Sequence, residues 1–217
     1  MEFQANLIMY MEIIGSIAFS ISGAMVGIRL GMDMFGVIVL GCCTACGGGM
    51  CRDVILGRFP AFMQNPRYLW IAALTAFITF MVVYLNRHHL LGLSYRGKKR
   101  MDFILNLTDA IGLGAFTVVG IMVCEQLGYK GDYFVLIFMG TLTACGGGLL
   151  RDTMAGVKPY IFTKHIYAIA SILGGMMFIV ICEMGYEFRA VVISCVFMVL
   201  MRLLAAHYRW SLPKLKN

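Results

Sequence analysis

The chain has 217 residues, of which 60% are hydrophobic and 13% are charged, and its mean hydropathy is +0.83. Soluble domains carry about 25% charged residues, so this composition indicates a protein that crosses a membrane several times. The formal net charge of +7 does not indicate nucleic-acid binding, because the basic residues concentrate in short connections between apolar runs, as in cytoplasmic loops.

Seven apolar runs follow one another, each close to the roughly 20 residues that span a bilayer. The spans are predicted at residues 7–28, from 34 into the glycines at 47–49, and at 68–85, 103–123, 133–149, 165–182 and 188–206. No basic residue precedes the first run and no convincing cleavage site follows it, so we expect a retained span and no signal peptide. The sequence therefore predicts a single all-α membrane domain over residues 1–217.

A six-residue stretch, Thr-Ala-Cys-Gly-Gly-Gly, occurs twice. The copies lie at Thr44–Gly49 and Thr143–Gly148, and Arg-Asp follows each copy at 52–53 and 151–152. Each glycine costs a helix about 1 kcal/mol relative to Ala. We therefore expect the second and fifth helices to be broken at their glycines, Gly47, Gly48 and Gly49 in one copy and Gly146, Gly147 and Gly148 in the other.

The repetition extends beyond this motif. Glu12 aligns with Asp109, and Pro60 aligns with Pro159. Residues of about 7–85 and 103–182 are therefore two copies of a three-span unit, here called the first and second repeats, and the helix at 188–206 is added to them. An odd number of spans inverts the second copy, which predicts a pseudo-two-fold axis in the membrane plane. The strongly basic loop between spans three and four predicts an external N-terminus and a cytoplasmic C-terminus.

Two helix breaks that converge on one centre would present backbone carbonyl groups, which suit a cation. The alternative is that the glycines only let helices approach closely. We assign a candidate ion pathway to both motifs and to the acidic residues of spans one and four: Glu12, Thr44, Gly47, Gly48, Gly49, Arg52, Asp53, Asp109, Thr143, Gly146, Gly147, Gly148, Arg151 and Asp152.

The charged residues after the glycines need partners at membrane depth. Neighbouring residues on a helix point about 100° apart, so Arg52 and Asp53 are not expected to face each other. The predicted ion pairs therefore join the repeats: Arg52 with Asp152, and Arg151 with Asp53. The alternative is that these groups lie at the water interface and are solvated.

Glu12 and Asp109 occupy equivalent positions, and an acid within a span is a functional candidate. Both lie near span ends, where contact with water is the alternative. No metal site or cofactor is expected, because only Cys46 of the clustered cysteines has a counterpart, Cys145, and no His or acidic ligand lies among them. The chain also lacks the nucleophile, phosphate-loop and zinc motifs of common enzymes, so a non-enzyme is expected.

Taken together, these motifs resemble the prokaryotic trimeric intracellular cation (TRIC) channel family, a group that also carries a glycine transporter domain name. The resemblance rests on the doubled G-G-G-x-x-R-D-x-x-x-G motif, on Gly-x-x-x-Phe-x-x-x-Gly in spans one and four, and on the closing segment from Arg202 to Pro213. It implies a seven-helix subunit, a homotrimer with a pore in each subunit, and conduction of monovalent cations, chiefly K⁺. Glu12 departs from the family pattern, which has Asp there, but keeps the charge.

Two other functions are compatible with the sequence. Inverted repeats with broken helices are the usual layout of secondary transporters, so a transporter of a small solute such as glycine is the main alternative. A membrane scaffold without transport is the third. The partners expected in every case are membrane lipid and, from the resemblance, further copies of the same chain.

Overall fold

The computed structural model describes residues 2–86, 95–163, 166–208 and 210. Across these ranges the chain forms helices and no strand. In chain order they are α1 (Glu2–Arg29), α2 (Met34–Ile55), α3 (Ala61–Gln64), α4 (Arg67–Leu85), α6 (Tyr95–Cys124), the π-helix η1 (Glu125–Tyr129), α7 (Tyr133–Met154), α8 (Tyr160–Thr163), α9 (Ala168–Glu183) and α10 (Glu187–His207). The basic loop at 87–94, the pair at 164–165, and position 209 with the tail at 211–217 lie outside the described residues.

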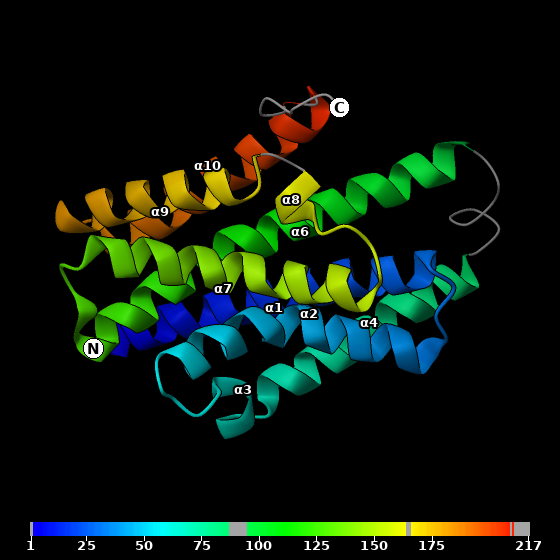
Figure 1. Cartoon of the computed structure of the whole chain (residues 1–217), viewed down its shortest axis with the longest axis horizontal. Helices are drawn as coiled ribbons and strands as arrows, with labels where there is room; N and C mark the ends of the chain where they lie inside the picture. Colours follow the sequence, from blue (N-terminus) through cyan, green and yellow to red (C-terminus); the bar gives the residue numbers. More distant parts are fainter. Residues whose placement is uncertain (1, 87–94, 164–165, 209, 211–217) are drawn as a thin grey trace.

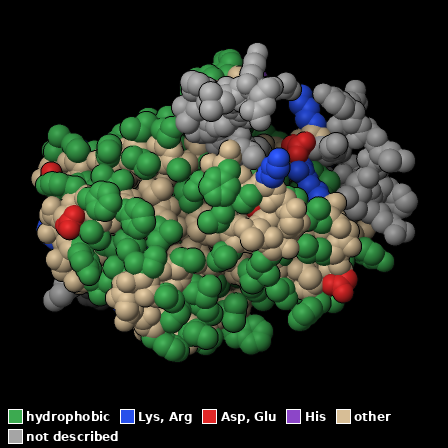
Figure 2. Space-filling view, in the orientation of Figure 1, with side chains coloured by type: hydrophobic (Ala, Val, Ile, Leu, Met, Phe, Trp, Pro, Cys, Tyr) green, Lys and Arg blue, Asp and Glu red, His purple; other side chains and the backbone are tan. Residues whose placement is uncertain are grey.

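Most of the predicted spans correspond to long apolar helices. Within the described ranges, six helical segments are long and apolar enough to cross a membrane: Phe3–Arg29, Met34–Ile55, Arg67–Leu85, Lys99–Tyr129, Tyr133–Met154 and Glu187–His207. The remaining predicted span, α9, is an apolar helix of 16 residues, which is short of the roughly 20 residues of a typical span. The count of seven spans is thus not confirmed by length alone. On the face shown in Figure 2, hydrophobic side chains dominate and charged ones gather toward the two ends of the molecule.

The same signals begin and end the equivalent helices of the two repeats. Asp33 caps α2 by accepting from the backbone N–H of Gly36 at 2.7 Å. Asp132 caps α7 in the same way. Gly57 and Gly156 follow α2 and α7 with φ of +66° and +67°, in the left-handed region that glycine adopts without strain. Matched turn chemistry therefore fixes matched helix lengths.

Helices of the two repeats pair with opposite directions. α1 runs alongside α6, and α2 alongside α7, each pair antiparallel (Figure 1). α4 packs against α1 and α2, whereas α9 and α10 pack on each other and on α6. The added helix α10 therefore lies with the second repeat and makes the two halves of the molecule unequal.

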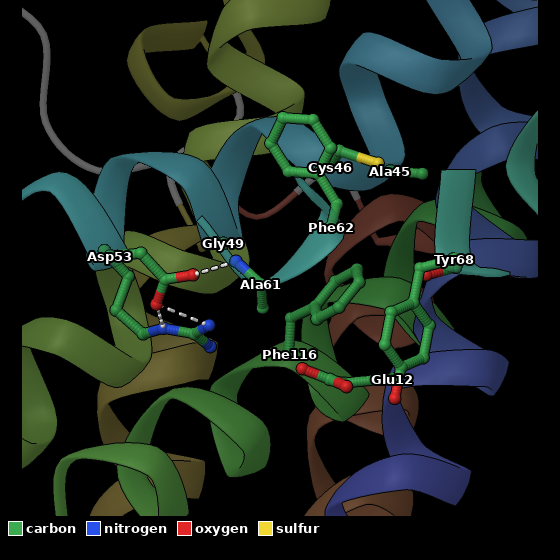
Figure 3. A pocket seen from close by; sticks show the side chains of 11 residues that line it. Glu12, Ala45, Cys46, Gly49, Asp53, Ala61, Phe62, Tyr68 and Phe116 are labelled. Atoms are coloured by element: carbon green, nitrogen blue, oxygen red, sulfur yellow. Dashed lines mark hydrogen bonds and ion pairs between the residues drawn. The ribbon is translucent and has the colours of Figure 1, made fainter. Parts of the chain in front are cut away.

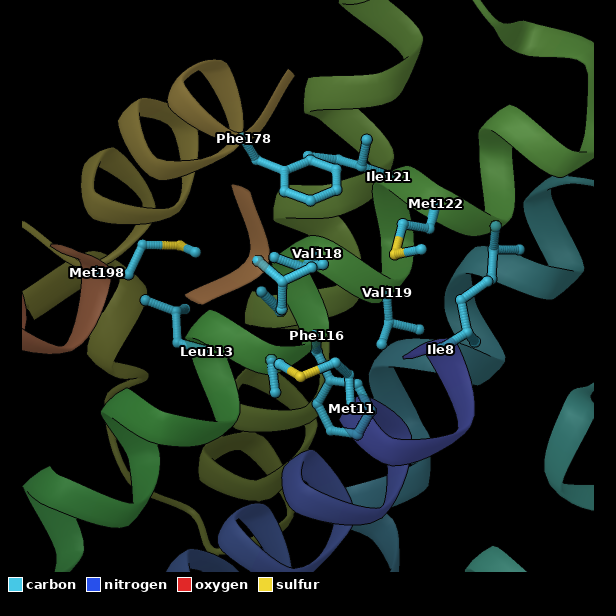
Figure 4. Close-up of a cluster of buried hydrophobic side chains, with 14 of the residues drawn as sticks. Ile8, Met11, Leu113, Phe116, Val118, Val119, Ile121, Met122, Phe178 and Met198 are labelled. Atoms are coloured by element: carbon cyan, nitrogen blue, oxygen red, sulfur yellow. The ribbon is translucent and has the colours of Figure 1, made fainter. Parts of the chain in front are cut away.

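The core lies between α1 and α6, where large side chains meet glycines. The rings of Phe19 and Phe116 are 5.3 Å apart between centroids, and Met11 and Phe116 belong to one buried cluster (Figure 4). Phe19 covers Gly112, and Phe116 covers Gly15: an added Cβ would come within 2.1 Å and 3.0 Å of the respective rings. Each phenylalanine thus fills the space that the other repeat leaves open by having glycine.

The helix breaks predicted at the glycines are not confirmed, because α2 and α7 run without interruption through residues 47–49 and 146–148. The glycines instead let the two backbones touch. A Cβ on Gly48 would lie 1.9 Å from the carbonyl oxygen of Thr143, and one on Gly147 would lie 2.1 Å from that of Thr44. The neighbouring helix occupies the space beside the glycines, so close packing describes their role in this structure.

Candidate functional site

The centre of the site is the crossing of α2 and α7, where the two Thr-Ala-Cys-Gly-Gly-Gly stretches meet. Thr44 and Thr143 are fully buried there, and each hydroxyl donates at 2.6 Å to the carbonyl oxygen four residues earlier in its own helix. Gly23 and Gly120 leave room for these threonines, since an added Cβ would lie 2.4 Å and 2.7 Å from their hydroxyl oxygens. The structure therefore brings both sequence motifs together, with the same contacts in each repeat.

Each arginine after the glycines pairs with the aspartate that follows it. Arg52 Nε lies 2.9 Å from Asp53 Oδ1, and Arg151 Nε lies 2.7 Å from Asp152 Oδ1. All four side chains are 2% exposed or less, which excludes the solvated alternative. The predicted cross-repeat pairs are wrong: in the described part of the chain, no ion pair joins Arg52 to Asp152 or Arg151 to Asp53. Neighbouring Cβ atoms do point apart, but the long arginine side chain folds back to reach its neighbour.

The same aspartates also accept hydrogen bonds from the short helices that follow α2 and α7. The second carboxylate oxygen of Asp53 accepts from the backbone N–H of Ala61 at 2.8 Å (Figure 3). Asp152 accepts from the backbone N–H of Tyr160 at the same distance. Each carboxylate thus neutralises a buried guanidinium and satisfies an otherwise unpaired amide at the start of α3 or α8.

In the first repeat, Glu12 borders a cavity of about 30 Å³, a volume that suits about one or two water molecules. Glu12 is half-buried and lies beside Tyr68 (Figure 3). The wall of the cavity also includes Gly49 of the central motif and the Arg52–Asp53 pair. Four of the predicted pathway residues of this repeat, Glu12, Gly49, Arg52 and Asp53, therefore line one small cavity.

In the second repeat, Asp109 is completely buried, so contact with water at a span end does not describe it. Its Oδ1 lies 2.7 Å from Arg151 Nη1, and Ser22 accepts a further hydrogen bond from the same nitrogen. Its Oδ2 lies 3.5 Å from Nη2 of Arg202, which comes from α10. The Arg202 guanidinium also lies 4.5 Å from the centroid of the Tyr167 ring.

Sequence reasoning did not place Arg202 in the site. The signal was present, because Arg202 lies inside the predicted span at 188–206, and an arginine at membrane depth requires a partner. What the sequence did not contain was the packing of α10 against α6, which brings Arg202 to Asp109.

The fold and the site define the class of this protein: an all-helical membrane domain of two matched halves that meet at the glycines of α2 and α7, with buried ion pairs inside each half. The chain matches the family described as glycine transporter over residues 9–84 and 106–183. It is 37% identical to a UPF0126 membrane protein of Vibrio cholerae, over 96% of this chain and 82% of that protein. It is 35% identical to the UPF0126 inner membrane protein YadS of Escherichia coli, over 95% of each.

Solved structures of similar proteins have the same fold. A TRIC trimeric intracellular cation channel orthologue from Rhodobacter sphaeroides is 29% identical, with a TM-score of 0.79 over 94% of this chain and 98% of that one. A prokaryotic TRIC channel in 0.5 M KCl is 26% identical, with a TM-score of 0.82 over 96% and 100% of the two chains. The chain therefore belongs to the prokaryotic TRIC family, and it is an integral membrane protein.

Proposed function

We propose that this protein is a channel for monovalent cations, chiefly K⁺, with a pore in each subunit of a homotrimer. The observation that carries the proposal is the likeness over nearly the whole chain to solved TRIC cation channels. The Rhodobacter sphaeroides relative is described as trimeric, which supports a trimer here. The E. coli relative is described as an inner membrane protein, which supports the same location, with the proposed external N-terminus and cytoplasmic C-terminus.

The charges at the helix crossing favour a cation as the permeating species. In the first repeat, the cavity beside Gly49 is bordered by two carboxylates, Glu12 and Asp53, and one guanidinium, Arg52. Acidic groups in a low-dielectric wall attract cations and repel anions. The pathway would pass from this cavity across the contact of α2 and α7 into the second repeat. No side chain fits between Gly48 and Thr143, so the two helices must separate before an ion can pass.

The alternative is a secondary transporter of a small solute such as glycine. Its support is the description of the matching family as glycine transporter, together with the general use of inverted repeats in transporters. Recordings from purified protein in planar bilayers separate the two. A channel gives unitary currents that reverse near the K⁺ equilibrium potential in asymmetric KCl. A transporter gives saturable glycine uptake that depends on an ion gradient, without unitary currents.

A further inference from the structure

The two repeats place equivalent acids in different surroundings. Glu12 borders a cavity, whereas its counterpart Asp109 is enclosed. One reason is side-chain size: Ala61, which lines the cavity, aligns with Tyr160, whose ring lies 5.2 Å from the guanidinium carbon of Arg151. The second repeat is therefore filled where the first is open.

A second reason is charge. The charged side chains that line the first cavity are two carboxylates and one guanidinium, an excess of one carboxylate. The ion pairs of the second repeat join the carboxylates of Asp109 and Asp152 to the guanidinium groups of Arg151 and Arg202, which leaves no excess. Arg202 is the additional cation beside Asp109, and it belongs to α10, a helix added after the second repeat.

The two arginines of the second repeat are held differently. Arg151 contacts Asp109 and Asp152 at 2.7 Å each and donates to Ser22. Arg202 reaches Asp109 only at 3.5 Å, and neither Arg202 Nε nor Asp109 Oδ2 has a hydrogen bond to any described residue. Arg151 is thus fixed on three sides, whereas Arg202 is held by charge attraction and by the face of Tyr167.

We infer that the Arg202 guanidinium occupies a cation-binding site formed by Asp109 and Tyr167, and that it blocks the second half of the pathway as a tethered competitor of the permeating cation. A carboxylate and an aromatic face are groups that bind a monovalent cation directly. In the first repeat, Glu12 and Tyr68 form the equivalent pair beside a cavity. Among the residues that the structure describes, the one arginine that lines this cavity is Arg52, which is paired with Asp53. The blocking role rests on the proposed channel function, whereas the cation site itself does not.

The test compares Arg202→Gln with Arg202→Lys and with Arg189→Gln in planar bilayers containing KCl. Arg189 lies on the same helix, 5.1 Å from the Tyr186 ring, and serves as the matched control. Arg202→Gln leaves Asp109 paired with Arg151, so no buried acid loses its last counter-charge. We expect the time-averaged K⁺ current of Arg202→Gln to rise at least about fivefold, the lower end of typical coupling between two states. Arg202→Lys, which keeps the charge, and Arg189→Gln are expected to stay near wild type.

A second measurement detects the site without conduction. The melting temperature of purified protein is recorded in KCl and in choline chloride at equal ionic strength. Arg202→Gln is expected to gain a K⁺-specific rise over wild type, because the vacated site binds K⁺, and Arg202→Gln/Asp109→Asn is expected to lose that gain.

These outcomes separate the two proposals. A wild-type protein without unitary currents, with the K⁺-specific gain present in Arg202→Gln, overturns the channel and keeps the cation site. A conducting wild type, with Arg202→Gln unchanged in both measurements, overturns the inference. Failure of Arg202→Gln to assemble where Arg202→Lys assembles also overturns it, because Arg202 is then a structural counter-ion.

Discussion

Gly48→Ala tests the contact at the centre of the structure. The added Cβ would lie 1.9 Å from the carbonyl oxygen of Thr143, about 1.5 Å closer than the 3.4 Å at which ordinary contacts begin. The obstacle is backbone on a packed helix, so α2 and α7 must move apart. Overpacking of this kind costs about 1–3 kcal/mol. We expect a lower melting temperature of the purified protein in detergent.

Gly49→Ala is the matched control. It adds the same methyl group to the same helix, but the nearest atom to its Cβ is Arg52 Nη2 at 3.8 Å, an ordinary contact. Both variants gain the same helix propensity, about 1 kcal/mol, so the difference between their free energies of unfolding isolates the clash with Thr143. Gly48→Ala should therefore be less stable than Gly49→Ala by about 1–3 kcal/mol. Equal stabilities would refute the close contact of the two motifs.

Three further predictions concern the ion pairs and the pathway. Asp53→Asn removes the one ion-pair partner that Arg52 has among the described residues, and should lower the free energy of unfolding by about 3–5 kcal/mol. Asp152→Asn should cost less, because Arg151 keeps its contact with Asp109 at 2.7 Å. The yield of assembled protein in size-exclusion chromatography compares the two variants, and equal losses of yield would contradict this difference. Arg29→Ala breaks a pair whose side chains are 28% and 50% exposed, and should change stability in thermal melting by less than about 1 kcal/mol; a larger loss would show that the pair is structural. Gly48→Leu and Gly147→Leu place a large side chain against the backbone of the opposite helix, so each should lower the yield of assembled protein and abolish K⁺ current in the fraction that assembles. Normal conduction by both would place the pathway elsewhere.

The positions of the helices were largely predictable because their signals are local. The apolar runs predicted spans at 68–85 and 188–206, and the helices are Arg67–Leu85 and Glu187–His207. α9 begins at Ala168 and not at the predicted residue 165, a difference that falls partly on residues that the structure does not describe. The capping aspartates and the glycines that follow α2 and α7 act through their own backbone neighbours, so a sequence carries their effect directly.

Helix propensity alone did not predict whether the glycines break α2 and α7 or let them pack closely. A cost of about 1 kcal/mol for each glycine favours a break in an isolated helix, but tertiary packing outweighs propensity. Gly48 and Gly147 each lie against the backbone of the opposite helix, a contact between residues about 100 positions apart in the sequence. The sequence was compatible with either close helix packing or a helix break at the glycines, and only the three-dimensional arrangement distinguishes the two.

The ion pairs depended on side-chain conformation, which periodicity does not describe. The Cβ atoms of Arg52 and Asp53 point in different directions, which predicts that the side chains do not meet. The long, flexible side chain of Arg52 nevertheless reaches the Asp53 carboxylate. Similarly, the contact of Arg202 with Asp109 depends on where α10 packs. The sequence therefore predicted that the two motifs would lie together, which the structure confirms, but it did not predict which charged groups would pair.

Cation conduction by this protein is tested by a planar-bilayer recording of the purified protein with KCl on one side and NaCl on the other. We predict unitary currents with a reversal potential set by K⁺, and their loss in Gly48→Leu. Saturable, gradient-dependent glycine uptake by the same preparation, without unitary currents, would contradict it.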